Sequence, residues 1–171
     1  MENDEIKTYF TTEALARFAS AQGKTVEKVV CHLWQNKSNP GETVEVIDNV
    51  ELQFTDKQKL TIGCNADGDG LDALEYNYKN AAIALEKEFE GKIRVYAIDA
   101  SSTKMWTEVI GKTLKLVKIE KENGQYKANA LLLDFETEKR EIEINPLDGI
   151  IIDYYDEEGV YQPFVDDDPV N

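Results

Sequence analysis

Two short segments in which apolar and polar residues alternate constrain the fold of this chain most. They cover residues 50–55 and 59–64, and only a polar stretch at residues 56–58 separates them. The apolar positions are Val50, Leu52, Phe54, Leu60, Ile62 and Cys64. Alternation with a period of two on both sides of a short polar break is typical of a β-hairpin. We therefore expect a hairpin with one face on the core and the other face in water.

The rest of the chain supplies further helix and strand patterns. Residues 11–22 and 75–90 carry apolar side chains at helical spacing, and each segment is followed by a glycine. Further strands are predicted at residues 26–35, 92–99, 113–122, 125–135, 139–145 and 149–155. Asn123-Gly124 is the strongest short hairpin signal among them. The pattern predicts an α+β fold, with two helices packed on a largely antiparallel β-sheet.

A length of 171 residues suits a single domain. We assign residues 1–155 to one α+β domain and residues 156–171 to an acidic, aromatic C-terminal tail. The sequence pattern of the first hairpin is weakly repeated at residues 133–149, where a similar hairpin again ends in Asp-Gly. A duplicated helix-plus-hairpin unit, with halves 1–75 and 76–155, would explain it. Two unrelated hairpins can also share such a pattern, so duplication and chance similarity both stay open as explanations.

The net charge of −15 is spread unevenly. Residues 141–171 hold ten of the 34 acidic residues and contain no Lys or Arg. Binding to a phosphate backbone needs the opposite sign of charge, so a nucleic-acid partner is not expected. A basic protein partner fits an acidic surface through electrostatic steering and complementarity. The alternative is that the acidity only keeps the protein soluble.

No targeting or membrane signal is visible. The N-terminal residues lack a basic region followed by an apolar core, and no apolar run approaches the ~20 residues of a membrane helix. The two cysteines, Cys31 and Cys64, lie inside apolar strand patterns, where thiols behave as small hydrophobes. We expect a cytoplasmic protein without membrane contact or cofactor. The oligomeric state stays open.

One loop, residues 65–72, has the composition of a cation site. Asn65, Asp67 and Asp69 place oxygen atoms at alternate positions, and Gly70 follows. This spacing partly resembles an EF-hand calcium loop, so these three residues are candidate metal ligands. The pattern departs from that loop at its end, where Tyr76 stands in place of the bidentate glutamate. The alternative is a solvated Asp/Gly turn that caps the second helix.

No catalytic motif stands out. His32 is the only histidine and lies in an apolar strand pattern, where a packed or half-exposed side chain is expected. No serine has a nucleophile-elbow setting, no glycine-rich phosphate loop is present, and no His/Cys cluster has zinc spacing. Carboxylates are abundant, which leaves a hydrolase with paired carboxylates as a rival class. We expect a protein that is not an enzyme.

The C-terminal residues mix carboxylates with tyrosines. Tyrosine offers a large contact area and one polar group, which suits protein interfaces. The candidate partner-binding residues are Tyr155, Asp156, Glu157, Glu158 and Tyr161. The alternative is an end that packs its aromatic rings on the domain and frays after Pro163.

In size, acidity and lack of catalytic motifs, the chain is similar to the small cytosolic immunity proteins that neutralise bacterial toxins. The resemblance implies a binding protein that masks the basic surface of a toxin or nuclease, and it assigns no role to any single residue. The rival functions are a structural or scaffolding domain and a calcium-dependent binding module that uses the loop at residues 65–72.

Overall fold

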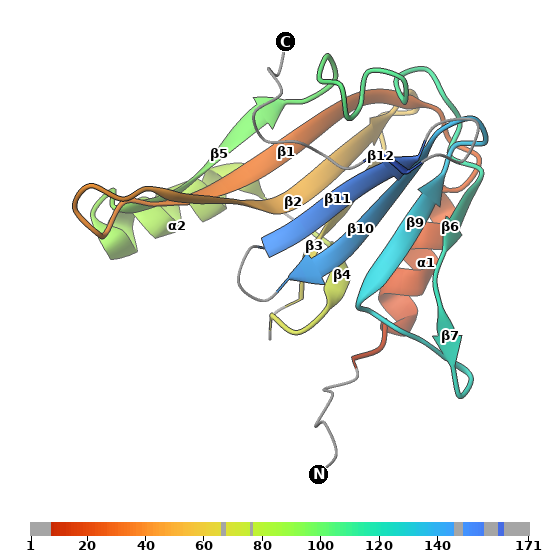
Figure 1. Cartoon of the computed structure of the whole chain (residues 1–171), viewed down its shortest axis with the longest axis horizontal. Coiled ribbons are helices and arrows are strands. Elements are labelled where there is room, and N and C mark those ends of the chain that lie inside the picture. The colour runs from red at the N-terminus through yellow and green to blue at the C-terminus, as the bar shows by residue number, and fades with distance from the viewer. Residues whose placement is uncertain (1–7, 66–67, 76, 146–148, 156–160, 163–171) are drawn as a thin grey trace.

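The fold was analysed in a computed structural model, which describes residues 8–65, 68–75, 77–145, 149–155 and 161–162 (Figure 1). Two helices are described, α1 (Thr12–Ala21) and α2 (Tyr78–Phe89). The strands are β1 (Val26–Asn36), β2 (Val44–Phe54), β3 (Lys59–Cys64), β4 (Leu71–Leu74), β5 (Ile93–Asp99), β6 (Leu116–Lys118), β7 (Lys121–Glu122), β8 (Gln125–Tyr126), β9 (Ala130–Asp134), β10 (Lys139–Asn145), β11 (Gly149–Tyr155) and β12 (Tyr161–Gln162). The expected α+β class is confirmed, with β-structure predominating.

Most strands belong to one curled sheet that has two leaves. The first leaf has the order β5-β1-β2-β3-β4, and each neighbouring pair in it is antiparallel. The second leaf has the order β11-β10-β9-β6 and is also antiparallel. One parallel contact joins the leaves, where Gly149 at the start of β11 pairs with Ile47 of β2.

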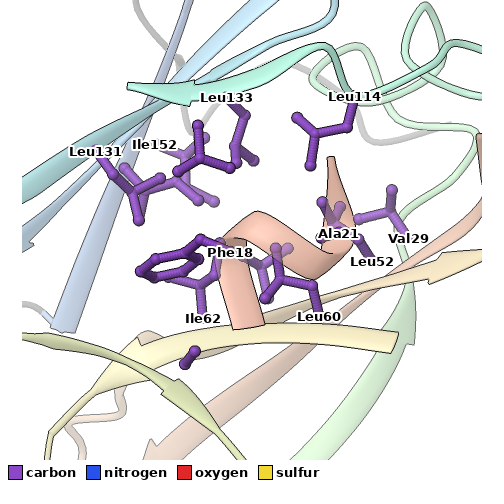
Figure 2. Packing of buried hydrophobic residues seen from close by; sticks show 14 of the residues in the cluster. Phe18, Ala21, Val29, Leu52, Leu60, Ile62, Leu114, Leu131, Leu133 and Ile152 are labelled. Atoms are coloured by element: carbon purple, nitrogen blue, oxygen red, sulfur yellow. The ribbon is translucent and has the colours of Figure 1, made fainter. Parts of the chain in front are cut away.

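The inner faces of the two leaves close around α1 and form one hydrophobic core. Figure 2 shows Phe18 and Ala21 of α1 between the side chains of Leu52, Leu60 and Ile62 and those of the second leaf. These residues are at most 4% exposed. Thr11 caps α1, since its hydroxyl accepts a hydrogen bond from the Ala14 amide at 3.1 Å. The helix therefore starts where the sequence predicts.

Beyond the contact with Gly149, the ends of β1, β2 and β5 extend away from the second leaf, and we call this part the arm (Figure 1). Helix α2 covers one face of the arm, where Val95 is 4% exposed and Tyr78 lies 5.2 Å from the ring of His32. No residue of α2 is fully buried. The helix is thus a thin layer on one side of three strands.

The first hairpin is confirmed, and its outer face is less exposed to solvent than predicted. Val50, Leu52, Phe54, Leu60 and Ile62 are at most 2% exposed, and Cys64 is half-buried. On the opposite face, Glu51 and Thr61 are each only 6% exposed. Gln53 and Lys59 explain the burial of Glu51, because their side-chain nitrogens lie 2.6 and 3.8 Å from its carboxylate.

Two sequence predictions need correction. The loop at residues 65–72 does not cap the second helix, because the chain first forms β4 and the helix starts at Tyr78 with Asn77 as its cap. The long strands expected around Asn123-Gly124 are each divided in two, giving a separate β7–β8 hairpin and the β6–β9 pair. The duplicated unit stays a prediction. Among the described residues, no helix is long and apolar enough to cross a membrane.

Candidate basic-partner interface

The outer face of the second leaf carries three neighbouring carboxylates, Glu141, Glu143 and Asp153, which we call the carboxylate cluster. Glu141 of β10 stands directly opposite Asp153 of β11 in the strand register. The side chains of these residues are half-buried, whereas the alternate residues Ile142 and Ile152 point into the core and are at most 4% exposed. The alternation of the two strands therefore places like charges side by side on an open sheet face.

No described cation neutralises the carboxylate cluster. None of its three side chains forms an ion pair with a residue that the structure describes. The two lysines on the same face, Lys118 and Lys139, both lie against Asp134, with Nζ–Oδ distances of 3.5 and 3.8 Å. The face is thus divided into a neutralised end at Asp134 and an acidic end at β10 and β11.

The environment of the cluster changes the proton affinity of Glu141. Partial burial raises the pKa of Glu141, and the nearby charges of Glu143 and Asp153 raise it further. Leu132 of β9 contributes to the apolar surroundings, since it is the register partner of Glu141 on the other side. The ionised form of Glu141 is therefore disfavoured in the isolated protein. A cation placed beside it would lower the pKa of Glu141 toward its ordinary value.

The candidate partner-binding residues of the tail continue from the same strand. Tyr155 is the last residue of β11 and pairs in register with Tyr161 of β12. Asp156, Glu157 and Glu158 lie between these strands in the sequence and fall outside the described residues. The tail thus follows directly after β11, the strand that also supplies Asp153, and its residues Tyr161 and Gln162 pair with that strand as β12.

Of the loop predicted at residues 65–72, residues 65–70 connect β3 to β4 and the last two belong to β4. Two of the described polar residues in this connection bond to each other. The Asn65 amide donates to the Asp69 carboxylate at 2.9 Å, and the Asp69 backbone N–H donates to Asn65 Oδ1 at 3.2 Å. Asp67 lies outside the described residues. Among the residues that are described, no group of three or more His, Cys, Asp or Glu side chains could hold a metal ion. The metal assignment of Asn65, Asp67 and Asp69 stays a prediction.

His32 is a packed residue of the first leaf. It is 3% exposed, and its Nδ1 lies 2.7 Å from Oδ1 of Asn49, whose amide in turn donates to Asp48 at 2.8 Å. Because Asn49 uses its NH₂ group toward Asp48, its oxygen faces the imidazole and the Nδ1–H of His32 is the donor. The arrangement orients the ring beneath Tyr78 of α2.

From the sequence, the members of the carboxylate cluster are visible only as part of an acidic stretch. Their side-by-side placement depends on the register of the β10–β11 hairpin. The turn signal at residues 146–149 indicates the hairpin, but pairing residues symmetrically about these four residues would place Glu141 opposite Tyr154. In the structure Asn145 pairs with Gly149, and this register places Glu141 opposite Asp153.

Comparison of the chain with protein-family models, with curated proteins and with solved structures gave no match.

Proposed function

We propose that this chain is a small acidic binding protein that recognises a basic protein partner through the outer face of its second leaf. The observation that carries the proposal is the cross-strand pair of Glu141 and Asp153, with Glu143 beside it and no described cation to neutralise them. A partner that presents Lys or Arg supplies the missing charge. The chain acts by binding and not by catalysis.

The cluster has an energetic cost that a partner would offset. Like charges directly opposite each other in an antiparallel sheet destabilise it. Pairing each carboxylate with a cation converts this repulsion into charge-assisted hydrogen bonds. The acidity of residues 141–171 also acts at longer range, because it attracts a basic partner before contact and raises the association rate.

In its specific form, the proposal is an immunity-type inhibitor that acts in the cytoplasm and masks the basic surface of a toxin or nuclease. Acidic complementarity to a nucleic-acid-binding surface suits this role, since such surfaces are strongly basic. The tail residues Tyr155, Asp156, Glu157, Glu158 and Tyr161 extend the acidic surface beyond β11 and add aromatic contact area.

The test begins with capture of partners from the native lysate, followed by association kinetics with a purified partner. Glu141→Gln, Glu143→Gln and Asp153→Asn are combined in one variant. The matched control combines Glu86→Gln, Glu88→Gln and Glu108→Gln, which changes the net charge equally at exposed positions elsewhere. We expect the cluster variant to associate at least about tenfold more slowly at low salt, with a flatter salt dependence.

A second variant, in which Asp156, Glu157 and Glu158 are neutralised together, distinguishes the contribution of the tail to binding from that of the sheet face. We expect weaker binding with nearly unchanged stability. Binding that is as tight and as salt-dependent in the cluster and tail variants as in the charge-matched control would overturn the proposal.

A further inference from the structure

Three strands of three or more residues form the edges of the sheet in the described part of the chain: β4, β5 and β6. Side chains from α1 and its C-cap hold two of these edges. Arg17 donates to the Ala73 carbonyl of β4 at 2.5 Å, and Gln22 accepts a hydrogen bond from the Val117 amide of β6 at 2.9 Å. Since the unpaired backbone of an edge strand can pair with another strand, these contacts protect β4 and β6.

The outer edge of β5 has no such cap. On its inner edge, the Lys92 carbonyl accepts a hydrogen bond from the Lys37 amide at 2.7 Å. The Ala100 amide likewise donates to the Val29 carbonyl at 2.8 Å, so the even-numbered residues bond to β1. Because backbone groups alternate in direction along an antiparallel strand, the odd-numbered residues turn their N–H and C=O groups away from β1. No described residue bonds to these outward groups, which belong to Ile93, Val95, Ala97 and Asp99.

The open edge borders an apolar surface on the inner face of the arm. A rung crosses the three strands on this face, in which Leu33 pairs with Ile47 on one side and with Tyr96 on the other. All three side chains are half-buried. Helix α2 lies against the opposite face (Figure 1), so no described helix covers this rung. An occupant of the edge must therefore supply an extended strand and apolar side chains together.

β5 of a second copy supplies both. In an antiparallel pair that overlaps the whole strand, Ile93 lies opposite Asp99 of the second copy and Val95 lies opposite Ala97. These are the residues whose backbone groups point outward, so each copy satisfies the other with about eight hydrogen bonds across the pair. Tyr96 then stands at the twofold axis, opposite its own counterpart.

The side chains on the inner face also match in this register. The apolar rung at Leu33 and Tyr96 continues across the axis into the same rung of the second copy. Arg94 belongs to the next rung, where it donates to Gln35 at 3.0 Å, and it falls opposite Ile98 of the second copy. Like charges therefore do not meet across the contact.

We propose that two copies of this chain associate through the outer edges of their β5 strands, antiparallel about a twofold axis at Tyr96. The contact is isologous, because the same strand is used by both copies, and it joins the two first leaves into one continuous sheet. It goes beyond the proposed function, since it uses a different leaf from the carboxylate cluster. The dimer carries two such clusters.

The test combines light scattering after gel filtration with amide hydrogen exchange over a range of protein concentrations. The amides of Arg94 and Tyr96 bond to β1 in the monomer and in the dimer, whereas those of Val95 and Ala97 are covered only in the dimer. As the mass rises from monomer to dimer, we expect the Val95 and Ala97 amides to exchange at least about tenfold more slowly. The Arg94 and Tyr96 amides should stay nearly unchanged.

Two variants of Ala97 test the backbone contact. Ala97→Pro removes an outward N–H from each copy and leaves the hydrogen bonds to β1 in place, because proline is tolerated where the N–H of an edge strand faces solvent. We expect this change to weaken the dimer at least about tenfold. Ala97→Thr is the matched control, since it keeps the N–H and suits a strand. Urea unfolding verifies that both variants are folded.

Two cysteine variants test the register. Tyr96→Cys places two thiols opposite each other at the axis, where the Cα atoms of a non-hydrogen-bonded pair lie about 4.5 Å apart, within reach of a disulfide. Arg94→Cys is the matched control, because its two thiols would lie four residues apart along the strands, about 13 Å, which is too far. Mild oxidation should therefore cross-link the first variant and not the second.

A chain that stays monomeric at every concentration would overturn the proposal. So would equal association of the Ala97→Pro and Ala97→Thr variants, or equal cross-linking of the two cysteine variants. Val95 and Ala97 amides that exchange slowly in a monomer would assign the edge to another part of the same chain. Protection that appears only with a captured partner would assign it to that partner. Either result would also overturn the dimer, and neither would affect the test of the carboxylate cluster.

Discussion

At the scale of single residues, Gly149 is the position at which the two leaves of the sheet meet. Its φ angle is +77°, and a Cβ atom there would lie 2.5 Å from the carbonyl oxygen of Ile47. A side chain would therefore suffer both an unfavourable backbone conformation and a clash with the backbone of β2. The parallel contact between β11 and β2 depends on a residue without a side chain.

Gly149→Ala should lower the free energy of unfolding more than Gly124→Ala. Gly124 has nearly the same φ angle, +79°, and beyond its chain neighbours no atom lies within 4 Å of the position that a Cβ would take, so it isolates the backbone effect. We expect ~1–2 kcal/mol for Gly124→Ala and a further ~1–3 kcal/mol for Gly149→Ala from the clash. Urea unfolding measures both. Equal losses would mean that the leaves do not meet closely at Gly149.

At the scale of elements, the β10–β11 hairpin carries the electrostatic cost of the carboxylate cluster. The raised pKa of Glu141 means that the folded state holds the proton more tightly than the unfolded state. This contribution to stability is complete below the unfolded pKa and is lost as the pH rises through the folded pKa. At neutral pH the ionised cluster therefore works against the fold.

Glu141→Gln should stabilise the protein at neutral pH by ~0.2–1 kcal/mol, because the amide removes one of two opposed charges. The gain should disappear below about pH 4, where the native glutamate is protonated in both states. Thermal melts between about pH 3.5 and 7.5 test this, with Glu86→Gln on α2 as the control for loss of an exposed carboxylate. A loss of stability at neutral pH would show that Glu141 has a favourable partner in the isolated protein.

The β3–β4 loop permits a direct test of the calcium hypothesis. The bonds between Asn65 and Asp69 already use the groups that would have to turn toward an ion. We therefore expect calcium to leave the melting temperature unchanged. A rise with calcium that disappears in the combined variant Asp67→Asn and Asp69→Asn would establish a metal site by linkage.

At the scale of the whole molecule, residues 100–112 connect the two leaves, and Arg140 holds this segment against the second leaf. Arg140 is fully buried. It donates to the Met105 carbonyl at 2.5 Å and to Glu138 at 3.0 Å, and its guanidinium lies 6.0 Å from the ring of Trp106. The segment has no regular strand, yet Trp106 is only 1% exposed.

Arg140→Met should cost ~3–5 kcal/mol, because it breaks a buried ion pair and leaves Glu138 without its cation. Lys115→Met is the control, since the side chains of Lys115 and its partner Glu136 are 55% and 71% exposed, and it should cost about 1 kcal/mol or less. Denaturant unfolding compares the two. Combining Arg140→Met with Glu138→Gln should recover part of the loss, which separates the unpaired carboxylate from the lost packing.

Local sequence patterns alone were sufficient to predict much of the fold. The alternation at residues 50–64 identified the first hairpin and its core residues, and the Thr11 cap and the Asn123-Gly124 turn were readable because they depend on neighbours within a few positions. The strand predicted at residues 26–35 is also present, and as β1 it lies between β2 and β5.

Only the tertiary structure decided which distant segments meet. Four residues of β4 are too few for a periodic signal, and the strand exists because β3 offers it an edge. The placement of Glu141 beside Asp153 follows from strand register, and the open outer edge of β5 follows from its pairing, among the described strands, with β1 alone. Alternation tells which face of its own strand a residue occupies, whereas the pairing of strands far apart in the sequence determines which charges become neighbours.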